Sequence, residues 1–379
     1  MSKNIYIYSE RFILILLLSL LGYLGVYAQN SSSEFNSLSY VSEEFSFSDM
    51  TEKLNLKGTL ILPQKMNSFT KIVILVAPPF PIYRDYDGLF STLADVLGRN
   101  GIATLRFDNR SYSDKTFLPR QETVTMYNQA DDVHNAILNL RKDKRFNHNP
   151  IGLLGHSEGG CSVAIEASKN KTIDFAIFLS TCGIKGVEFA YDQTAMPLMF
   201  NERIDSIIKE NMLLSMRKYL EIVDRYASSD SIRICISQAV KAYYNSVQNK
   251  KEVFGRSTLQ EISETISWTY TRPRFMAFVK YDPKKYFSDL SCPVLVMCGK
   301  MDGVQDCEKN LGGIAQIFKE NGKKDYEILA IDSVNHGYRK AKALVPMFIE
   351  QMSSHNPRMA KPKFAIDVFQ RIADWIDEH

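Results

Sequence analysis

A serine between glycines is the residue whose surroundings most clearly suggest chemistry in this sequence. Ser157 is the centre of the segment G-H-S-E-G at residues 155–159, which fits the pattern G-x-S-x-G. An apolar stretch precedes it at residues 151–154, and a helix-forming stretch follows at residues 161–167. In a sharp turn from strand to helix, the serine hydroxyl is raised above the sheet edge, and the next N–H lies at a helix N-terminus. The pattern predicts a nucleophilic Ser157 and an oxyanion donor at the backbone of Glu158, in preference to a plain glycine turn.

A serine hydroxyl is a poor nucleophile at neutral pH, so it needs a base. His336 lies in the segment N-H-G after a predicted strand at residues 326–331, where the active sites of open sheets assemble, so it is the predicted base. His156 directly precedes the nucleophile and is expected to support the turn. The remaining histidines lie in polar or amphipathic stretches and are expected to be solvated: His134, His148, His355 and His379.

The base needs an acidic partner at the end of another strand. Asp302 follows a predicted strand at residues 293–298, in the segment G-K-M-D-G, and is the preferred acid. Asp306 is a close competitor and stays open as an alternative. Asp332 also ends a strand, but it lies so close to His336 on the same loop that it ranks third.

Strands and helices that could position these residues alternate along much of the chain. Strands are predicted at residues 45–47, 57–62, 72–77, 102–107, 151–154, 175–180, 293–298 and 326–331. Helices are predicted at residues 89–99, 128–142, 160–168, 307–319 and 365–376. Strands that are apolar on both faces indicate a mostly parallel sheet covered on both sides.

The alternation stops between about residues 185 and 285. Apolar and charged residues recur there at helical spacing, in residues 204–226 and 233–248, without a comparable strand-like run. A helical insertion is therefore expected in this region.

Composition limits the class of protein. The 379 residues are 45% hydrophobic and 23% charged, enough to bury a large core in one α/β domain with an insertion. The 46 basic and 43 acidic residues form no concentrated basic stripe, so nucleic acid is not expected as a partner. None of the six cysteines has C-x-x-C spacing and no His/Cys cluster occurs, so we expect no metal or cofactor. Disulfide pairing stays open, with buried free thiols favoured for most cysteines.

The N-terminus has the pattern of an export signal. Lys3 and Arg11 precede an apolar run at residues 12–21, and small residues at Val26 and Ala28 fit signal peptidase cleavage. The alternative is a membrane anchor, but the run is about half of the roughly 20 residues needed to span a bilayer. We therefore expect a signal peptide at residues 1–28, cleaved after Ala28. The mature protein would be periplasmic or secreted and would have no stable membrane span.

Together these residues resemble the α/β-hydrolase fold, and more closely the serine esterases of bacterial export compartments that carry a GHSEGG nucleophile elbow. The segments R-F-D-N-R at residues 106–110 and Y-D-P at residues 281–283 are similar to R-Y-D-x-R and Y-D-P of that group. Asp302 and His336 match its acid and base positions. The resemblance implies a doubly wound, mostly parallel sheet with a helical lid inserted after the sixth strand. The core would comprise residues 29–184 and 286–379, and the lid residues 185–285.

One segment departs from this group. Residues 78–81 read P-P-F-P where the relatives usually carry G-S-G-P or H-G, and Pro79 has no N–H to donate. The segment is similar to the H-G-F-P loop of other α/β-hydrolases, in which the Phe donates, so the resemblance assigns the second oxyanion donor to the backbone of Phe80. Arg84 and Asp85 match an R-D pair of the relatives, and an internal salt bridge is the default interpretation.

The resemblance implies hydrolysis of carboxylic esters of small molecules through an acyl-enzyme on Ser157. A peptidase, amidase or acyltransferase with the same three residues is an alternative, and so is a catalytically degenerate hydrolase-fold binding protein. Side chains of the insertion are expected to line an acyl pocket or to form ordinary lid core: Phe189, Tyr191, Met196, Met199 and Phe200.

Overall fold

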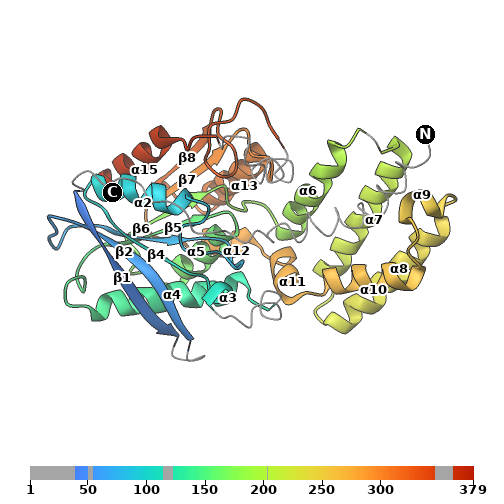
Figure 1. Ribbon diagram of the computed structural model, residues 1–379, viewed down its shortest axis with the longest axis horizontal. Coiled ribbons are helices and arrows are strands. Elements are labelled where there is room, and N and C mark those ends of the chain that lie inside the picture. Colours follow the sequence, from blue (N-terminus) through green and yellow to red (C-terminus); the bar gives the residue numbers. More distant parts are fainter. Residues whose placement is uncertain (1–38, 50–53, 114–122, 203, 346–361) are drawn as a thin grey trace. The chain divides into compact units, whose positions relative to one another are not determined.

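The computed structural model describes residues 39–49, 54–113, 123–202, 204–345 and 362–379. The predicted signal peptide, residues 1–28, and His355 lie outside the described residues. The chain divides into two compact units (Figure 1). The first, here the core unit, holds the described residues up to Ile184 and those from Asp282 onwards, and the second, here the helical unit, is Lys185–Tyr281.

The core unit contains an eight-stranded sheet with the strand order β1-β2-β4-β3-β5-β6-β7-β8. Strand β1 pairs antiparallel with β2, and β2 pairs antiparallel with β4, whereas the other neighbours are parallel. The strands are β1 Tyr40–Asp49, β2 Leu54–Pro63, β3 Ile72–Val76, β4 Ala103–Phe107, β5 Ile151–His156, β6 Phe175–Leu179, β7 Val294–Gly299 and β8 Tyr326–Ile331. This order, with an antiparallel opening hairpin, is that of the α/β-hydrolase fold, and the expected mostly parallel sheet is confirmed.

The central strands form because their residues can be buried on both faces. Every residue of β3, β5, β6 and β7 is buried, whereas the edge strand β8 is only partly buried. The register between β3 and β5 sets Val76 opposite Gly155. The end of β3 therefore lies beside the turn that carries Ser157.

Helices cover both faces of this sheet (Figure 1). Helices α2 (Leu89–Arg99) and α15 (Ile366–Glu378) pack in one core with side chains of the central strands. Their buried residues recur every three or four positions, as at Leu89, Leu93 and Leu97, so each presents one apolar stripe. The remaining helices are α3 Arg110–Ser113, α4 Met126–Lys142, α5 Glu158–Lys169, α12 Pro283–Phe287 and α13 Cys307–Glu320, and α4 packs against α5.

The helical unit follows β6 in the chain and consists, in its described residues, of helices and their connections. These are α6 Gly186–Met199, α7 Ser206–Arg225, α8 Ser229–Ser246, α9 Lys250–Phe254, α10 Leu259–Tyr270 and α11 Pro273–Val279. Side chains of Asp205, Ser228 and Thr258 accept hydrogen bonds from backbone N–H groups at the starts of α7, α8 and α10. Within the described part of the chain, no helix is both long enough and apolar enough to cross a bilayer.

Candidate active site

Ser157 occupies a strained turn between β5 and α5. Its φ of 55° and ψ of −128° fall in a sparsely populated region, which costs about 1–3 kcal/mol for a residue with a side chain. Neighbouring groups hold the turn: the Ser157 N–H donates to the Leu179 carbonyl at 2.8 Å, and the Thr181 hydroxyl donates to the Ser157 carbonyl at 3.1 Å. The turn is thus fixed by the adjacent end of β6.

The glycines of the motif allow strand and helix to approach closely. A Cβ at Gly155 would lie 2.5 Å from the Gly160 Cα. A Cβ at Gly159 would lie 2.2 Å from the Val76 carbonyl oxygen at the end of β3. Real Cβ atoms do not come so close to other atoms, so the Ser157 turn requires glycine at both positions.

His336 and Asp302 form a buried pair at the ends of β8 and β7. The His336 Nδ1 lies 2.7 Å from Asp302 Oδ2, and both side chains are buried. Burial alone would raise the pKa of Asp302, but the His336 charge and hydrogen bond, with backbone N–H groups of Val304 and Gln305, hold it below its ordinary value. When His336 is neutral, an ionised Asp302 can only accept, so Nδ1 carries the proton and Nε2 has the lone pair. This Nε2 is buried and has no hydrogen-bond partner within the described residues.

The competing acids are engaged elsewhere. The Asp306 carboxylate caps α13 by accepting from the Lys309 N–H at 3.0 Å. The Asp332 carboxylate is exposed and pairs with Lys300 at 2.8 Å. Of the three candidate acids, Asp302 is therefore the one that contacts His336.

His156 contacts both the backbone carbonyl and the ring of His336. Its Nε2 lies 2.8 Å from the His336 carbonyl oxygen, and the two imidazole rings meet edge to face, with centroids 4.8 Å apart. Rings of Tyr86 and Tyr338 pack on the same imidazole. Burial, with repulsion from His336, lowers the pKa of His156 from 6.5 to about 3. His156 is therefore neutral at physiological pH and donates through Nε2 to the His336 carbonyl.

The two expected oxyanion donors differ in their surroundings. Glu158 is the first residue of α5, so its backbone N–H lies in the first turn of that helix. The Phe80 N–H instead donates to the Pro78 carbonyl at 2.7 Å. In this conformation the Phe80 N–H is hydrogen-bonded within its own loop, and its role as the second oxyanion donor stays a prediction. The Asn109 side-chain amide, for which the sequence carries no local signal, donates to the carbonyls of both Pro78 and Phe80.

Arg84 and Asp85 do not pair with each other. Arg84 forms a buried bidentate ion pair with Asp108, at 2.8 and 3.0 Å. Asp85 pairs with Arg106 at 2.8 Å. Both pairs fasten the segment after β3 to the end of β4, so each residue forms an internal salt bridge, as the default interpretation expects, with Asp108 and Arg106 as the partners.

The aromatic and methionine side chains expected around an acyl group differ in burial within the helical unit. Phe189 and Met196 are buried, and Phe189 packs edge to face on Phe278. Tyr191 lies under the Arg217 guanidinium, 3.7 Å from ring centroid to Cζ. Met199 and Phe200 are exposed.

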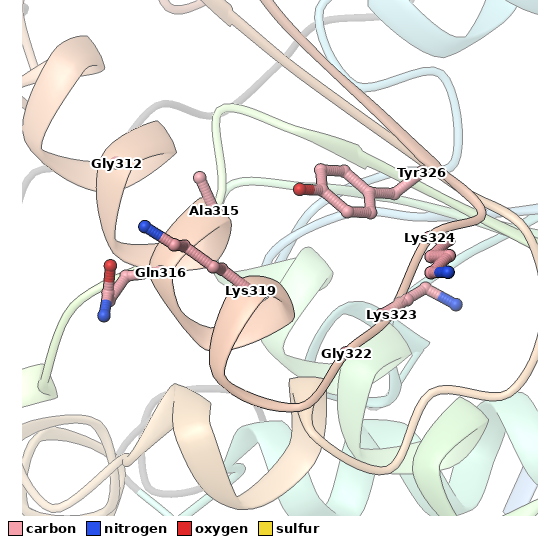
Figure 2. A pocket seen from close by; sticks show the side chains of 8 residues that line it. All are labelled: Gly312, Ala315, Gln316, Lys319, Gly322, Lys323, Lys324 and Tyr326. Carbon is pink, nitrogen blue, oxygen red and sulfur yellow. The ribbon is translucent and has the colours of Figure 1, made fainter.

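A surface pocket of about 430 Å³ lies beside α13 (Figure 2). Its lining is Gly312, Ala315, Gln316, Lys319, Gly322, Lys323, Lys324 and Tyr326. Tyr326 is the first residue of β8, whereas Asp302 and His336 follow the ends of parallel strands. The pocket therefore lies towards the opposite edge of the sheet from these two residues.

Comparisons with known proteins give likenesses to hydrolases. No family model matches the sequence. The thiohydrolase aneE of Aspergillus aculeatus is 31% identical over 104 residues, which are 27% of this chain and 31% of that protein. The chain thus matches less than a third of that relative's length.

Solved structures show a similar fold at low identity. An esterase of Pyrococcus furiosus is 12% identical, covers 94% of this chain and 98% of its own, and has a TM-score of 0.49. The acylaminoacyl peptidase of Pyrococcus horikoshii is 15% identical with a TM-score of 0.47, and the match covers 80% of this chain but 39% of that one. The strand order of the sheet, rather than these likenesses, defines the fold.

Proposed function

We propose that this protein hydrolyses carboxylic esters of small molecules through an acyl-enzyme formed on Ser157. The observation that carries the proposal is the buried His336–Asp302 pair, whose remaining ring nitrogen, Nε2, has no partner among the described residues. Ser157 follows β5, Asp302 follows β7 and His336 follows β8, so all three lie at the carboxyl edge of one parallel sheet. A serine on a strained turn and a buried His–Asp pair at this edge suit acyl transfer.

In the proposed reaction, Ser157 Oγ attacks the carbonyl carbon of the ester while His336 Nε2 takes the hydroxyl proton. Asp302 keeps the imidazole in the required tautomer and stabilises its positive charge. Collapse of the tetrahedral intermediate breaks the bond to the alcohol, which leaves with the proton from His336. Water, activated by the same His336, then attacks the acyl-enzyme, releases the acid and restores Ser157.

The oxyanion is proposed to bind the N–H groups of Glu158 and Phe80. For the second donor, the Phe80 N–H must turn away from the Pro78 carbonyl. A hydrogen bond between residues two apart closes a tight, bent turn and is weaker than a linear one. A developing negative charge is a stronger acceptor than a carbonyl, so it can draw this N–H away.

Thioesters are the second candidate substrate class, because the curated relative is called a thiohydrolase. Thioesters place the same acyl carbon before Ser157 but release a thiolate. Amide cleavage and acyl transfer use the same three residues with another leaving group or acceptor. A binding protein of this fold that lacks catalysis is the alternative outside enzymology.

Two further expectations belong to the proposal. Residues 1–28 are proposed to be a signal peptide cleaved after Ala28, which would make the mature protein periplasmic or secreted. The helical unit, Lys185–Tyr281, is proposed to act as a lid whose apolar side chains line the acyl pocket.

The test compares the mature protein, residues 29–379, with Ser157→Ala on p-nitrophenyl acetate, butyrate and octanoate and on phenyl thiobutyrate. Ser168→Ala is the matched control, because Ser168 is another buried serine of α5, hydrogen-bonded to the Ile165 carbonyl at 2.8 Å. We expect turnover that is lost in Ser157→Ala and retained in Ser168→Ala. The ratio of ester to thioester turnover ranks the two substrate classes. Absence of turnover in the wild-type protein on all four substrates would refute the proposal.

A further inference from the structure

A chain of buried amide and hydroxyl groups links the helix after Ser157 to the loop at residues 78–81. The Ser162 hydroxyl of α5 donates to the Gln129 side chain of α4 at 2.9 Å. The Gln129 side-chain amide donates to the Asn109 side-chain oxygen at 3.1 Å. Asn109 then donates to the carbonyls of Pro78 and Phe80, the latter at 2.7 Å. Ser162, Gln129 and Asn109 are each at most 3% exposed, so water competes little for their hydrogen bonds.

The Pro78 carbonyl accepts the hydrogen bond that the Phe80 N–H must break before it can bind an oxyanion. It accepts from the Phe80 N–H at 2.7 Å and also from the Asn109 side chain. A carbonyl oxygen has two lone pairs, so both donors can be served together. A buried carbonyl left without a donor is costly, whereas one that keeps a donor after losing another is not. With Asn109 in place, the Phe80 N–H can leave without stranding the Pro78 carbonyl.

We propose that Asn109 is a positioning residue that makes the Phe80 N–H available to the oxyanion. It keeps the Pro78 carbonyl hydrogen-bonded when the N–H turns away. It also holds the Phe80 carbonyl, so the peptide groups on both sides of the one that carries the Phe80 N–H are fixed. Gln129 and Ser162 fix Asn109 relative to α5, the helix that carries the other donor at Glu158. The inference rests on the proposed function, since it concerns the transition state of that reaction.

The test is Asn109→Asp, which keeps the size of the side chain and its acceptor for Gln129 but replaces the donating NH₂ by an oxygen. Asn149→Asp is the matched control. Asn149 is equally buried, and its side-chain amide also donates to two backbone carbonyls, those of Asn67 and Thr70, both at 2.8 Å. Asn149 directly precedes Pro150 and β5, at the amino edge of the sheet. The Asn149→Asp substitution therefore makes the same chemical change as Asn109→Asp, but away from the site.

Losing one oxyanion donor outright lowers kcat by about 10²- to 10³-fold. Because the Phe80 N–H is still present in Asn109→Asp, we expect a smaller fall in kcat, by about 10- to 100-fold, with KM changed less than about threefold. We expect Asn149→Asp to keep kcat within about twofold, whatever its loss of thermal stability. A trifluoromethyl ketone, whose adduct with serine carries an oxyanion, should bind Asn109→Asp more weakly by a factor similar to the fall in kcat. The corresponding methyl ketone should bind both variants equally.

Gln129→Glu is the second variant, which decides the matter if Asn109→Asp does not fold. It keeps the acceptor for Ser162 but removes the donor to Asn109, so kcat should fall severalfold with KM unchanged. Equal kcat values in the folded Asn109 or Gln129 variant and in Asn149→Asp would overturn the inference. Absence of both turnover and fluorophosphonate labelling in the wild-type protein would instead refute the proposed function.

Discussion

Protonation of His156 is predicted to destabilise the core unit in mildly acidic solution. The His156 ring is almost fully buried, and the rings of His336, Tyr86 and Tyr338 pack around it. Burial, with repulsion from His336, lowers its pKa from 6.5 to about 3, although the His336 carbonyl and Asp302 act in the opposite direction. Between these pH values the unfolded chain binds a proton that the folded protein does not. The free energy of unfolding therefore falls as the pH falls from 6.5 towards 3.

The magnitude follows from the two pKa values. At pH 4.5, two units below the unfolded pKa, the unfolded state is favoured by about 2.5 kcal/mol more than at pH 7.5, because each pKa unit corresponds to about 1.4 kcal/mol. The lowered pKa of Asp302 adds a further loss only below its ordinary value of 3.8. The range from pH 7.5 to 4.5 thus isolates His156 from this carboxylate.

The perturbation is His156→Gln, which keeps a donor for the His336 carbonyl but cannot be protonated. Urea unfolding would be followed by fluorescence in a Trp268→Phe background, so that Trp375 of the core unit is the remaining tryptophan of the two. The unfolding free energy of the His156 protein should fall by about 2.5 kcal/mol more than that of the Gln variant between pH 7.5 and 4.5. Parallel pH dependences in the two proteins would refute the reasoning.

Three further predictions concern the site and the thiols. Asp302→Asn should lower kcat by about 10⁴-fold, whereas Asp306→Asn, which caps α13 equally well, should keep it; the opposite ranking would identify Asp306 as the acid. Gly159→Ala should abolish turnover and lower the melting temperature, since its Cβ would lie 2.2 Å from the Val76 carbonyl oxygen. Gly312→Ala, with open space around the new Cβ, should do neither, and a stable, active Gly159 variant would contradict this. Ellman's reagent should titrate six thiols in the denatured protein, because every cysteine is free in the structure, and fewer would indicate disulfides.

The central strands could be predicted from the sequence because they are buried on both faces and read as short apolar runs. Helix α6 was not predicted individually, because its buried residues do not form one stripe and Pro197 lies inside it. Helix α10 did have a readable signal, since Thr258 and Glu261 form a capping box at its start.

The candidate site was predictable where the residues carry a local signature. Ser157 lies in a motif whose glycines are required by the turn, and His336 follows a strand end. The choice between Asp302 and Asp306 depends on which carboxylate faces the imidazole, and spacing along the chain does not determine that. The two hydrogen bonds that link Ser162, Gln129 and Asn109 join residues 33 and 20 positions apart in the sequence. Only the packing of α4 against α5 and the end of β4 brings these side chains together.

The central claim is that Ser157 is an activated nucleophile. The most direct measurement is to treat the protein, expressed as residues 29–379, with a fluorophosphonate and to locate the adduct by peptide mass spectrometry. We expect one adduct per chain, on the peptide that contains Ser157, and a labelling rate that falls sharply in His336→Ala. An adduct on another residue, or a labelling rate that is the same without His336, would contradict the claim.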